Sequence, residues 1–539
     1  MTLLETSASR TSILHQIAAV PQWDLIVIGG GITGAGVALE ASRNGLQTLL
    51  IEQRDFSWGT SSRSSKMIHG GLRYLSQGEI KLTRESVRER QRLLAEAPGL
   101  IEPLNYLFTF RKKSYPPRFL MGTLINIYGL MAGGRNHKYL KAKATKKFLP
   151  QLSDNNLLGS IQYSDALTDD CRLTLRTLEE ARAHGAVTIN YMEAEDLICS
   201  GGKVIGVEAR NSIGGKIISL HSKVTVNATG AWADNLRTQT GQKAQLRPLR
   251  GSHLVVPSWR LNVHQTFAYL HPQDKRGVFV YPWEGKTVIG TTDLDHKSDL
   301  NTEATITKEE IKYLLEGVNH HFPSSCLTES DILTTWSGVR PIVAREGQDP
   351  KKIKPSQARR DHCVWEDQGL VTVTGGKLTT FRAIAQDVLS CAAPLLGITP
   401  ASLNAAPLFQ NIGPVTSKEV KKLSIRFGPQ TLRRLKGFYG LHLKSLLSSA
   451  TDDDLSFIPG TKRLWCELQW EACHGMIVHL DDLLLRRMRI GFILPNGGQL
   501  HAGKFEKICR QSLGWTKERW TYEWDRYINI CRTSYSLPQ

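Results

Sequence analysis

The stretch DLIVIGGGITGAGVALEASRNGLQTLLIEQ, Asp24 to Gln53, decides the fold of this chain. It predicts a strand, a glycine turn, an amphipathic helix and a second strand that ends at Glu52. The turn contains three glycines in G-x-G-x-x-G spacing: Gly29, Gly31 and Gly34. In this motif the first glycine allows the tight turn, the second admits a pyrophosphate, and the third lets helix and strand pack closely. With phosphates at the helix N-terminus and an adenosine ribose at Glu52, the stretch predicts a dinucleotide site.

The composition limits the classes of protein to which the chain can belong. The length of 539 residues indicates about three domains. The formal net charge of +18 favours an anionic partner, such as nucleic acid, an acidic membrane surface or a phosphorylated metabolite. The nine cysteines form no C-x-x-C pair and their number is odd. We therefore expect a reducing compartment, no disulfide framework and no metal site.

The polar stretch 58–74 follows the second predicted strand and contains His69, Arg73 and Tyr74 close together. A loop in this place lies at the carboxyl edge of an α/β sheet, where such proteins bind ligands. The simpler interpretation is a flexible loop without a function. A surface helix is expected directly after it, over residues 79–97.

The region 103–153 contains no acidic residue and many lysines and arginines. Within it, residues 119–132 are mainly apolar, with Ile125 and Leu130 among them. This run is shorter than the roughly 18 residues that cross a bilayer, so we expect it to rest in the interface of an anionic membrane. The alternative is a buried core helix with solvated basic flanks.

The remaining chain predicts two further sheets and a helical region. Residues 187–228 have the short alternating runs of an antiparallel meander, which ends at the VNATGAWA motif. Residues 247–292 are rich in strands and are expected to cover the cofactor and hold the substrate. The strand 370–374 leads into GGKLTT and a helix starting near Thr379, whose N-terminus would face the ring if the cofactor is a flavin. Beyond about residue 396 we expect only helices.

These segments together resemble the FAD-dependent glycerol-3-phosphate dehydrogenases of the respiratory, quinone-reducing kind. The motifs that carry the resemblance span residues 24 to about 490: IVIGGGITGAG, TSSRSSKMIHGGLRYL, YSDALTDDCRL, VNATGAWA, RGSHLVVP, IGTTD, WSGVRP, GGKLTT and HLDDLLLRR. The combination of SSKMIHGGLRYL with GGKLTT is specific to this family.

The resemblance implies an α/β fold, with a Rossmann-like FAD-binding domain, an antiparallel substrate sheet as in glycine-oxidase-like flavoproteins, and an all-helical C-terminal domain. We expect an N-terminal extension over 1–22, the FAD-binding and substrate domains over 23–395, and a helical cap over 396–539. The substrate and membrane segments within the second unit are expected at about 76–160 and 245–365.

The resemblance also implies noncovalent FAD, the substrate glycerol 3-phosphate, electron transfer to a membrane quinone, and peripheral attachment of a cytoplasmic protein to the membrane. The residues implied to contact FAD are Gly29, Gly31, Gly34, Glu52, Thr60, Ser61, Ser65, Gly230, Gly375, Gly376, Leu378 and Thr379. Those implied to bind substrate are Arg73, Tyr74, Arg340, Arg360 and Lys377, with Arg359 as an alternative to Arg360.

Oxidation of a secondary alcohol needs a base for the hydroxyl proton. His253 and His69 are the candidates, with His253 slightly favoured, because histidine is largely neutral at working pH. Asp293 would orient the imidazole or hold a substrate hydroxyl. An oxidase that reduces oxygen and an amine oxidase of the same superfamily are alternatives. A nucleic-acid-binding protein is not expected, because no basic patch interleaved with aromatics is found. The sequence does not decide between a monomer and a homodimer.

Overall fold

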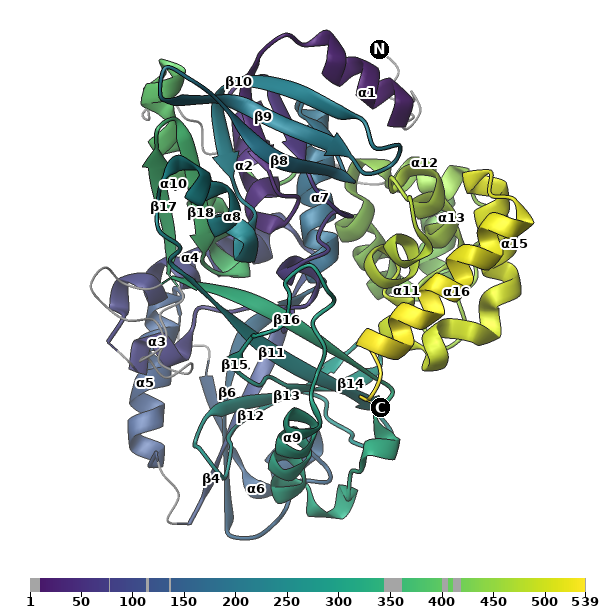
Figure 1. Ribbon diagram of the computed structural model, residues 1–539. Helices are drawn as coiled ribbons and strands as arrows, with labels where there is room; N and C mark the ends of the chain where they lie inside the picture. Colours follow the sequence, from purple (N-terminus) through teal and green to yellow (C-terminus); the bar gives the residue numbers. More distant parts are fainter. Residues whose placement is uncertain are drawn as a thin grey trace.

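A computed structural model of the chain describes residues 10–76, 78–112, 116–134, 137–343, 361–399, 406–410 and 418–538. Two sheets lie one above the other, and a domain of helices lies beside both (Figure 1). The predicted fold class, a Rossmann-like α/β unit with a largely antiparallel second sheet and a helical C-terminal domain, is confirmed.

The first sheet is built around the two strands predicted from the opening stretch. Its strands, in spatial order, are β17 (His362–Asp367), β18 (Leu370–Gly375), β10 (Ile217–Asn227), β1 (Trp23–Ile28), β2 (Thr48–Ile51) and β7 (Val187–Ile189). All neighbours are parallel except β17 and β18, and the predicted meander is formed by β8 (Met192–Ser200), β9 (Lys203–Asn211) and β10. The parallel strands are almost fully buried, as expected for a sheet covered on both faces.

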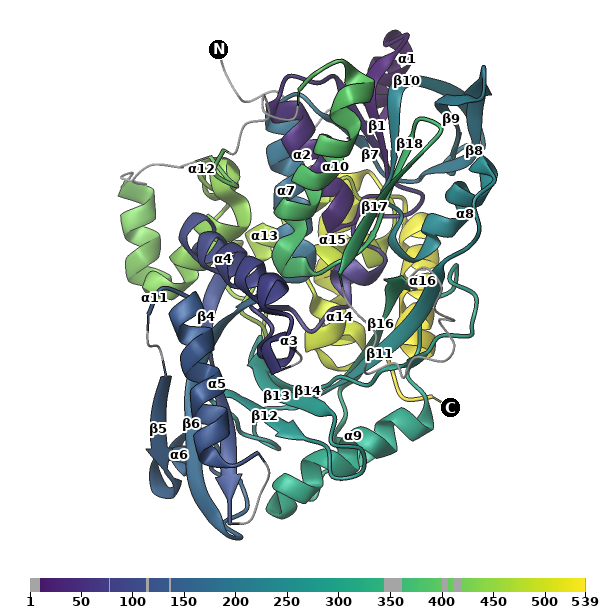
Figure 2. The same ribbon diagram turned by 90° about the vertical axis from the view of Figure 1, so that its left-hand side faces the viewer.

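Three helices pack together against one face of this sheet (Figure 2). They are α2 (Ile32–Arg43), α7 (Asp170–Ala183) and α10 (Phe381–Leu396). A Cβ on Gly36 of α2 would lie 3.0 Å from the Phe381 ring, so a glycine here permits the close approach of α10. The helix predicted near Thr379 thus begins at Phe381, after a 3₁₀ turn over Leu378–Thr380. On the other face, the helix α1 (Arg10–Ala19) buries Ile13 and Ile17.

The second sheet contains the strands predicted over residues 247–292. Its strands, in spatial order, are β15 (Leu294–Asp295), β11 (Leu246–Pro257), β14 (Lys286–Gly290), β13 (Gly277–Trp283), β12 (Thr266–Leu270), β4 (Ile101–Arg111), β6 (Leu157–Thr168) and β3 (Met67–Ile68). In addition, β16 (Thr334–Val343) pairs with β11, and β5 (His137–Lys141) pairs with β6. All pairs are antiparallel except β12 and β4, which run parallel where the two segments of this sheet meet. The helix α9 (Lys308–His321) packs beneath it.

The chain between β3 and β4 of the second sheet forms two helices. The surface helix predicted over 79–97 is α4 (Ile80–Glu96), preceded by α3 (Leu72–Ser76). Within the described ranges, every helix is too short or too polar to span a lipid bilayer.

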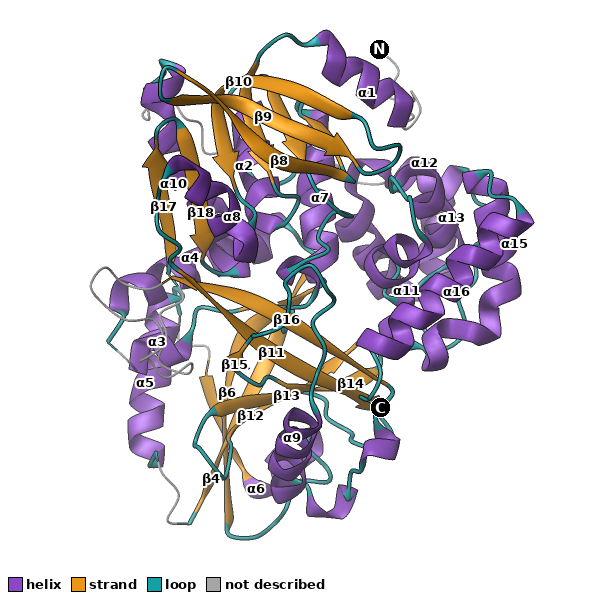
Figure 3. Cartoon of the chain, in the orientation of Figure 1, coloured by secondary structure: helices purple, strands orange, loops and turns teal. Residues whose placement is uncertain are grey.

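The C-terminal domain contains helices and loops (Figure 3). Its main helices are α11 (Lys418–Tyr439), α12 (Leu443–Ser448), α13 (Trp465–His474), α15 (Ala502–Leu513) and α16 (Lys517–Ser534), with a π-helical segment over Asp482–Arg487 and the short α14 (Ile490–Ile493) between α13 and α15. Leu435 and Phe438 join the apolar core of α2 and α7, whereas Leu483 and Tyr527 join the core on the face of the second sheet opposite α9. The domain therefore shares its hydrophobic core with both sheets.

Candidate cofactor and substrate site

A cavity of about 390 Å³ lies at the carboxyl ends of the parallel strands. Its wall is formed by the glycine turn after β1, the loop after β2, the turn after β10, the end of β16 and the corner after β18. The segments of the first sheet come from distant parts of the chain and meet because parallel strands end at the same edge of a sheet. The end of β16 reaches the cavity from the second sheet. The size is that of a ligand pocket.

The glycine turn has the close backbone approaches that its motif requires. Gly29 has a φ of +115°, and a Cβ there would lie 2.6 Å from the carbonyl oxygen of Ala228. A Cβ on Gly34 would collide with the carbonyl oxygen of Gly29, so this glycine serves packing of helix on strand. The amide of Ile32, at the start of α2, donates to Ser61 Oγ at 2.9 Å. The loop after β2 is thereby fixed to the helix N-terminus.

Glu52 lies at the end of β2 and lines the cavity. One carboxylate oxygen accepts a hydrogen bond from the amide of Gly30 at 2.6 Å and the other from the amide of Arg54 at 2.9 Å. Burial raises the pKa of Glu52, and these two donors oppose that shift. Each oxygen has a second lone pair, so the carboxylate can still accept from a ribose hydroxyl.

Most of the cofactor residues predicted from the sequence lie on the cavity wall. They are Gly29, Gly31, Glu52, Thr60, Ser61, Gly230, Gly375, Gly376 and Leu378. Three predicted residues have other contacts in the described structure. Gly34 packs behind the turn, Ser65 Oγ lies 2.8 Å from His253 Nε2, and Thr379 Oγ1 bonds to the backbone nitrogen and oxygen of His69 at 3.1 and 3.2 Å.

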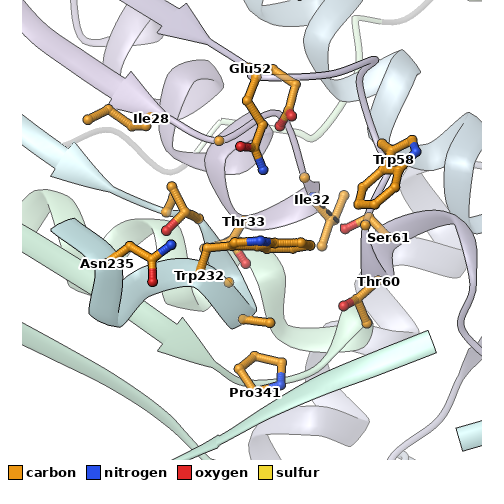
Figure 4. A pocket seen from close by; sticks show the side chains of 18 of the residues that line it. Ile28, Ile32, Thr33, Glu52, Trp58, Thr60, Ser61, Trp232, Asn235 and Pro341 are labelled. Atoms are coloured by element: carbon orange, nitrogen blue, oxygen red, sulfur yellow. Dashed lines mark hydrogen bonds between the residues drawn. The ribbon is translucent and has the colours of Figure 1, made fainter. Parts of the chain in front are cut away.

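Two tryptophans and two asparagines on the wall were not predicted. Figure 4 shows Trp232 in the middle of the lining side chains, with Asn235 on one side and Thr60 on the other. The rings of Trp232 and Trp58 are 6.0 Å apart, and Trp232 Nε1 donates to Asn301 Oδ1 at 3.1 Å. Trp232 stands in the VNATGAWA motif, where a large aromatic residue two positions after Gly230 was the available signal.

The second sheet brings His253 and Arg340 to one face. β11 and β16 are paired so that His253 lies opposite Trp336 and Gly251 opposite Gly338. Since side chains two residues apart point to the same face, Arg340 extends over Gly251, whose missing Cβ leaves space for the guanidinium. Arg340 also lines the cavity.

His253 is 1% exposed, and its ring stacks on that of Trp336 with centroids 4.9 Å apart. Burial lowers its pKa well below the ordinary value of 6.5, and the cations Arg340, Lys66 and Arg276 lower it further. The imidazole is therefore neutral over the whole physiological range. A neutral, positioned imidazole is able to accept a proton.

Asp293 connects two arginines at this face. Its carboxylate accepts from Arg340 Nη1 at 3.1 Å, and Arg276 Nη2 lies 3.6 Å from its other oxygen. Arg340 Nη2 also donates to Thr291 Oγ1 at 3.3 Å. Arg276 was not predicted, because it stands in a turn outside every motif and only the fold brings it to Asp293.

A second cation approaches the cavity from the corner after β18. Lys377 lines the cavity, its Nζ lies 3.8 Å from the centre of the Tyr74 ring, and it donates to Ser86 Oγ at 3.1 Å. The structure thus brings the predicted residues Lys377 and Tyr74 together. The side chain of Arg73, and the whole of Arg359 and Arg360, lie outside the described residues.

The wall fits a flavin dinucleotide. Its glycines allow the tight backbone turns that form the wall, a carboxylate lies at the end of β2, and two cations lie at the end formed by β16 and the β18 corner. Among the described residues, no cluster of histidine, cysteine, aspartate and glutamate has the arrangement of a metal site.

Comparison with known proteins identifies relatives along nearly the whole chain. Residues 24–388 match the family model described as FAD dependent oxidoreductase, and residues 391–520 match the C-terminal domain of alpha-glycerophosphate oxidase. A glycerol-3-phosphate dehydrogenase of Mycobacterium leprae is 35% identical over 92% of this chain and 86% of its own length. An aerobic glycerol-3-phosphate dehydrogenase of Staphylococcus haemolyticus is 32% identical over 94% of both chains. The crystal structure of glycerol-3-phosphate dehydrogenase from Bacillus halodurans complexed with FAD superimposes with a TM-score of 0.75, at 29% identity, over 98% of this chain and 97% of that one.

Proposed function

The chain belongs to the family of FAD-dependent glycerol-3-phosphate dehydrogenases, and on this premise we propose that it oxidises sn-glycerol 3-phosphate to dihydroxyacetone phosphate with a membrane quinone as acceptor. The observation that carries the proposal is the position of Arg340 and Lys377 on the wall of a glycine-lined dinucleotide cavity. A guanidinium and an ammonium group suit a dianionic phosphate.

We assign the phosphate to Arg340 and Lys377. The planar fork of Arg340 can bind two phosphate oxygens at once, and Asp293 fixes its orientation through the 3.1 Å contact. Lys377 adds a point charge, held over the Tyr74 ring. Arg73 and Arg360 are proposed as further phosphate ligands on the strength of their motifs alone.

Bound FAD supplies the hydride acceptor for carbon 2 of the substrate. We assign the hydroxyl proton to His253 Nε2, the nitrogen 2.8 Å from Ser65 Oγ and thus on the side of the cavity loop. Ser65 and the stacked Trp336 hold the imidazole in place. His69 remains the second candidate, with its backbone fixed by Thr379 and its side chain half-buried.

The reaction is tested by mixing the oxidised protein with glycerol 3-phosphate in the absence of oxygen. We expect the visible absorbance band of the oxidised flavin to disappear as the flavin is reduced. A soluble quinone should then restore it much faster than air does. Bleaching followed by equally fast recovery in air would favour the oxidase instead, and no bleaching would contradict the substrate.

The acceptor proposal is supported by an exposed apolar helix with basic surroundings. The helix α5 (Arg118–Met131) lies on the outside of the second sheet in both views (Figures 1 and 2). Phe119 is 86% exposed and Leu130 is 59% exposed, while Ile125, expected at the membrane, is buried at 1%. One face of the helix therefore packs on the protein and the other exposes large apolar side chains beside the lysines of β5 and α6 (Ala142–Phe148). This arrangement suits peripheral binding to an anionic cytoplasmic membrane surface.

Replacing Phe119 and Leu130 together by glutamate should weaken binding to anionic vesicles at least about tenfold, because two apolar side chains leave the interface and two anions enter it. Flotation with phosphatidylglycerol-containing liposomes measures this. A control variant carries glutamate at Ile213 and Ile217, which are 40% and 47% exposed on the meander. If both variants float as the wild type does, α5 is not the membrane contact.

A further inference from the structure

The loop between β2 and β3, residues 53–66, forms one wall of the cofactor cavity. Gln53, Trp58, Gly59, Thr60, Ser61 and Ser64 of this loop line the cavity. Its regular structure is a single 3₁₀ turn over Thr60–Ser62. Within the loop, the backbone nitrogens of Trp58, Ser62 and Arg63 donate to the carbonyl oxygens of Asp55, Gly59 and Thr60. Contacts on the side facing away from the cavity add to these turns in holding the loop in shape.

The C-terminal domain holds the start of this loop through a buried carboxylate. Asp55 is 0% exposed and lies between two guanidinium groups of the π-helical segment. Arg487 donates to its two oxygens at 2.5 and 2.7 Å, and Arg486 donates through Nε. Burial alone would raise the pKa of Asp55, but Arg487 and Arg486 hold that pKa below its ordinary value. The carboxylate is therefore ionised and paired.

The same domain holds the other end of the loop. Arg489 Nη2 donates to the carbonyl oxygen of Ser62 at 2.9 Å and pairs with Asp170. Asp170 in turn accepts from the backbone nitrogen of Ser64 at 2.9 Å and from its hydroxyl at 2.7 Å. Lys66 Nζ donates to the same Ser62 carbonyl at 3.2 Å. Three arginines within four positions of the C-terminal domain thus contact both ends of a single cavity wall.

None of the cavity-lining residues identified in the described structure comes from the C-terminal domain. We propose that Arg486, Arg487 and Arg489 are positioning residues for FAD, through which the C-terminal helical domain keeps the loop 53–66 in its cofactor-binding shape. Removal of one arginine leaves the buried charge of its carboxylate partner only partly compensated, which displaces the loop. A displaced loop must be ordered again when FAD binds, and this cost lowers the affinity. The inference depends on the cofactor and on neither the substrate nor the acceptor.

The affinity for FAD measures the effect directly. Deflavinated protein is titrated with FAD, and binding is followed by quenching of flavin and tryptophan fluorescence. For R487Q we expect a dissociation constant raised at least about tenfold, since reordering a few side chains costs that much affinity. R487K keeps the charge without the planar fork and should lie between R487Q and the wild type. The visible circular dichroism of bound flavin should change in the same order.

A matched control is the ion pair of Arg434 and Glu467, which lies in the same domain and does not contact the loop. Arg434 donates to both oxygens of Glu467 at 2.7 and 2.6 Å, and Glu467 is fully buried. R434Q should lower the thermal stability and leave the FAD dissociation constant within about twofold of the wild type.

Two results would overturn the proposal. One is an unchanged FAD affinity in folded R487Q; the other is equal weakening by R487Q and R434Q, which would indicate general destabilisation of the domain. Should R487Q fail to fold, D55N and R487K take its place against R434Q, with the same expectation. Because the titration contains no glycerol 3-phosphate and no quinone, its outcome is independent of the proposed reaction.

Discussion

Glutamine in place of His253 is expected to lower kcat by about 100-fold to 10,000-fold, the range for loss of a general base. Glutamine keeps a hydrogen-bonding group near Ser65, so the 2.8 Å contact has a substitute and FAD binding should be unchanged. Stopped-flow reduction of the flavin by glycerol 3-phosphate isolates the affected step. H69Q serves as the comparison, and a large loss there with a small loss in H253Q would assign the base to His69.

The pH dependence distinguishes a base at this position from an ordinary histidine. Burial, Arg340, Lys66 and Arg276 lower the pKa of His253, so the neutral form persists as the pH falls through 6.5. The acid limb of kcat/KM should therefore lie well below pH 6.5 in the wild type. In a variant without the Arg340 charge the limb should move upward, because one of the cations that oppose protonation is gone. An acid limb near pH 6.5 that does not move when Arg340 is replaced would contradict the assignment of His253 as the base.

Arg340→Ala is expected to raise the KM for glycerol 3-phosphate by about 100-fold, which corresponds to roughly 3 kcal/mol for a charge-assisted phosphate contact. The slow oxidation of unphosphorylated glycerol should change by no more than about threefold, since that substrate has no group for the arginine to bind. Arg340→Lys should recover part of the affinity, because the charge remains and the fork is lost.

The control for this variant is Arg260→Ala, which removes an arginine paired with Asp331 at 2.5 Å in the turn after β11, away from the cavity. Steady-state kinetics with both substrates on both variants complete the comparison. Equal losses on glycerol and on its phosphate would mean that Arg340 does not recognise the phosphate and acts through Asp293 or the fold.

The cofactor half of the site was predictable because its information is local. A Cβ on Gly34 would meet the backbone of Gly29, and a Cβ on Gly29 would meet the backbone of Ala228 at the end of the adjacent strand. The glycine spacing alone therefore indicates the turn. The position of Glu52 was also predictable, because the length of the predicted strand places this residue at the end of β2. The glycines of the turns and the acid at the end of the second strand therefore predicted residues that line the cavity.

The rest depends on contacts between distant segments, which no local pattern reveals. Lys66 and Arg276 lower the pKa of His253, yet no helix or strand periodicity in the sequence singles out either residue. The apolar run of α5 predicted one continuous membrane face, whereas packing against β6 buries Ile125 and divides the helix into two sides. The arginines of HLDDLLLRR were visible in the sequence, but their partner Asp55 is more than 400 positions earlier.

The strand order of the first sheet has a consequence for biosynthesis. β10 lies between β1 and β18, and β18 is made only after the whole second segment of the other sheet. On the ribosome, the free edge of β10 stays open for roughly ten seconds or more at about 5–20 residues per second. During this interval it is a template for intermolecular pairing. Ribosome-associated chaperones and the rate of translation between β10 and β18 should therefore govern the yield of active enzyme more than the stability of the finished fold does.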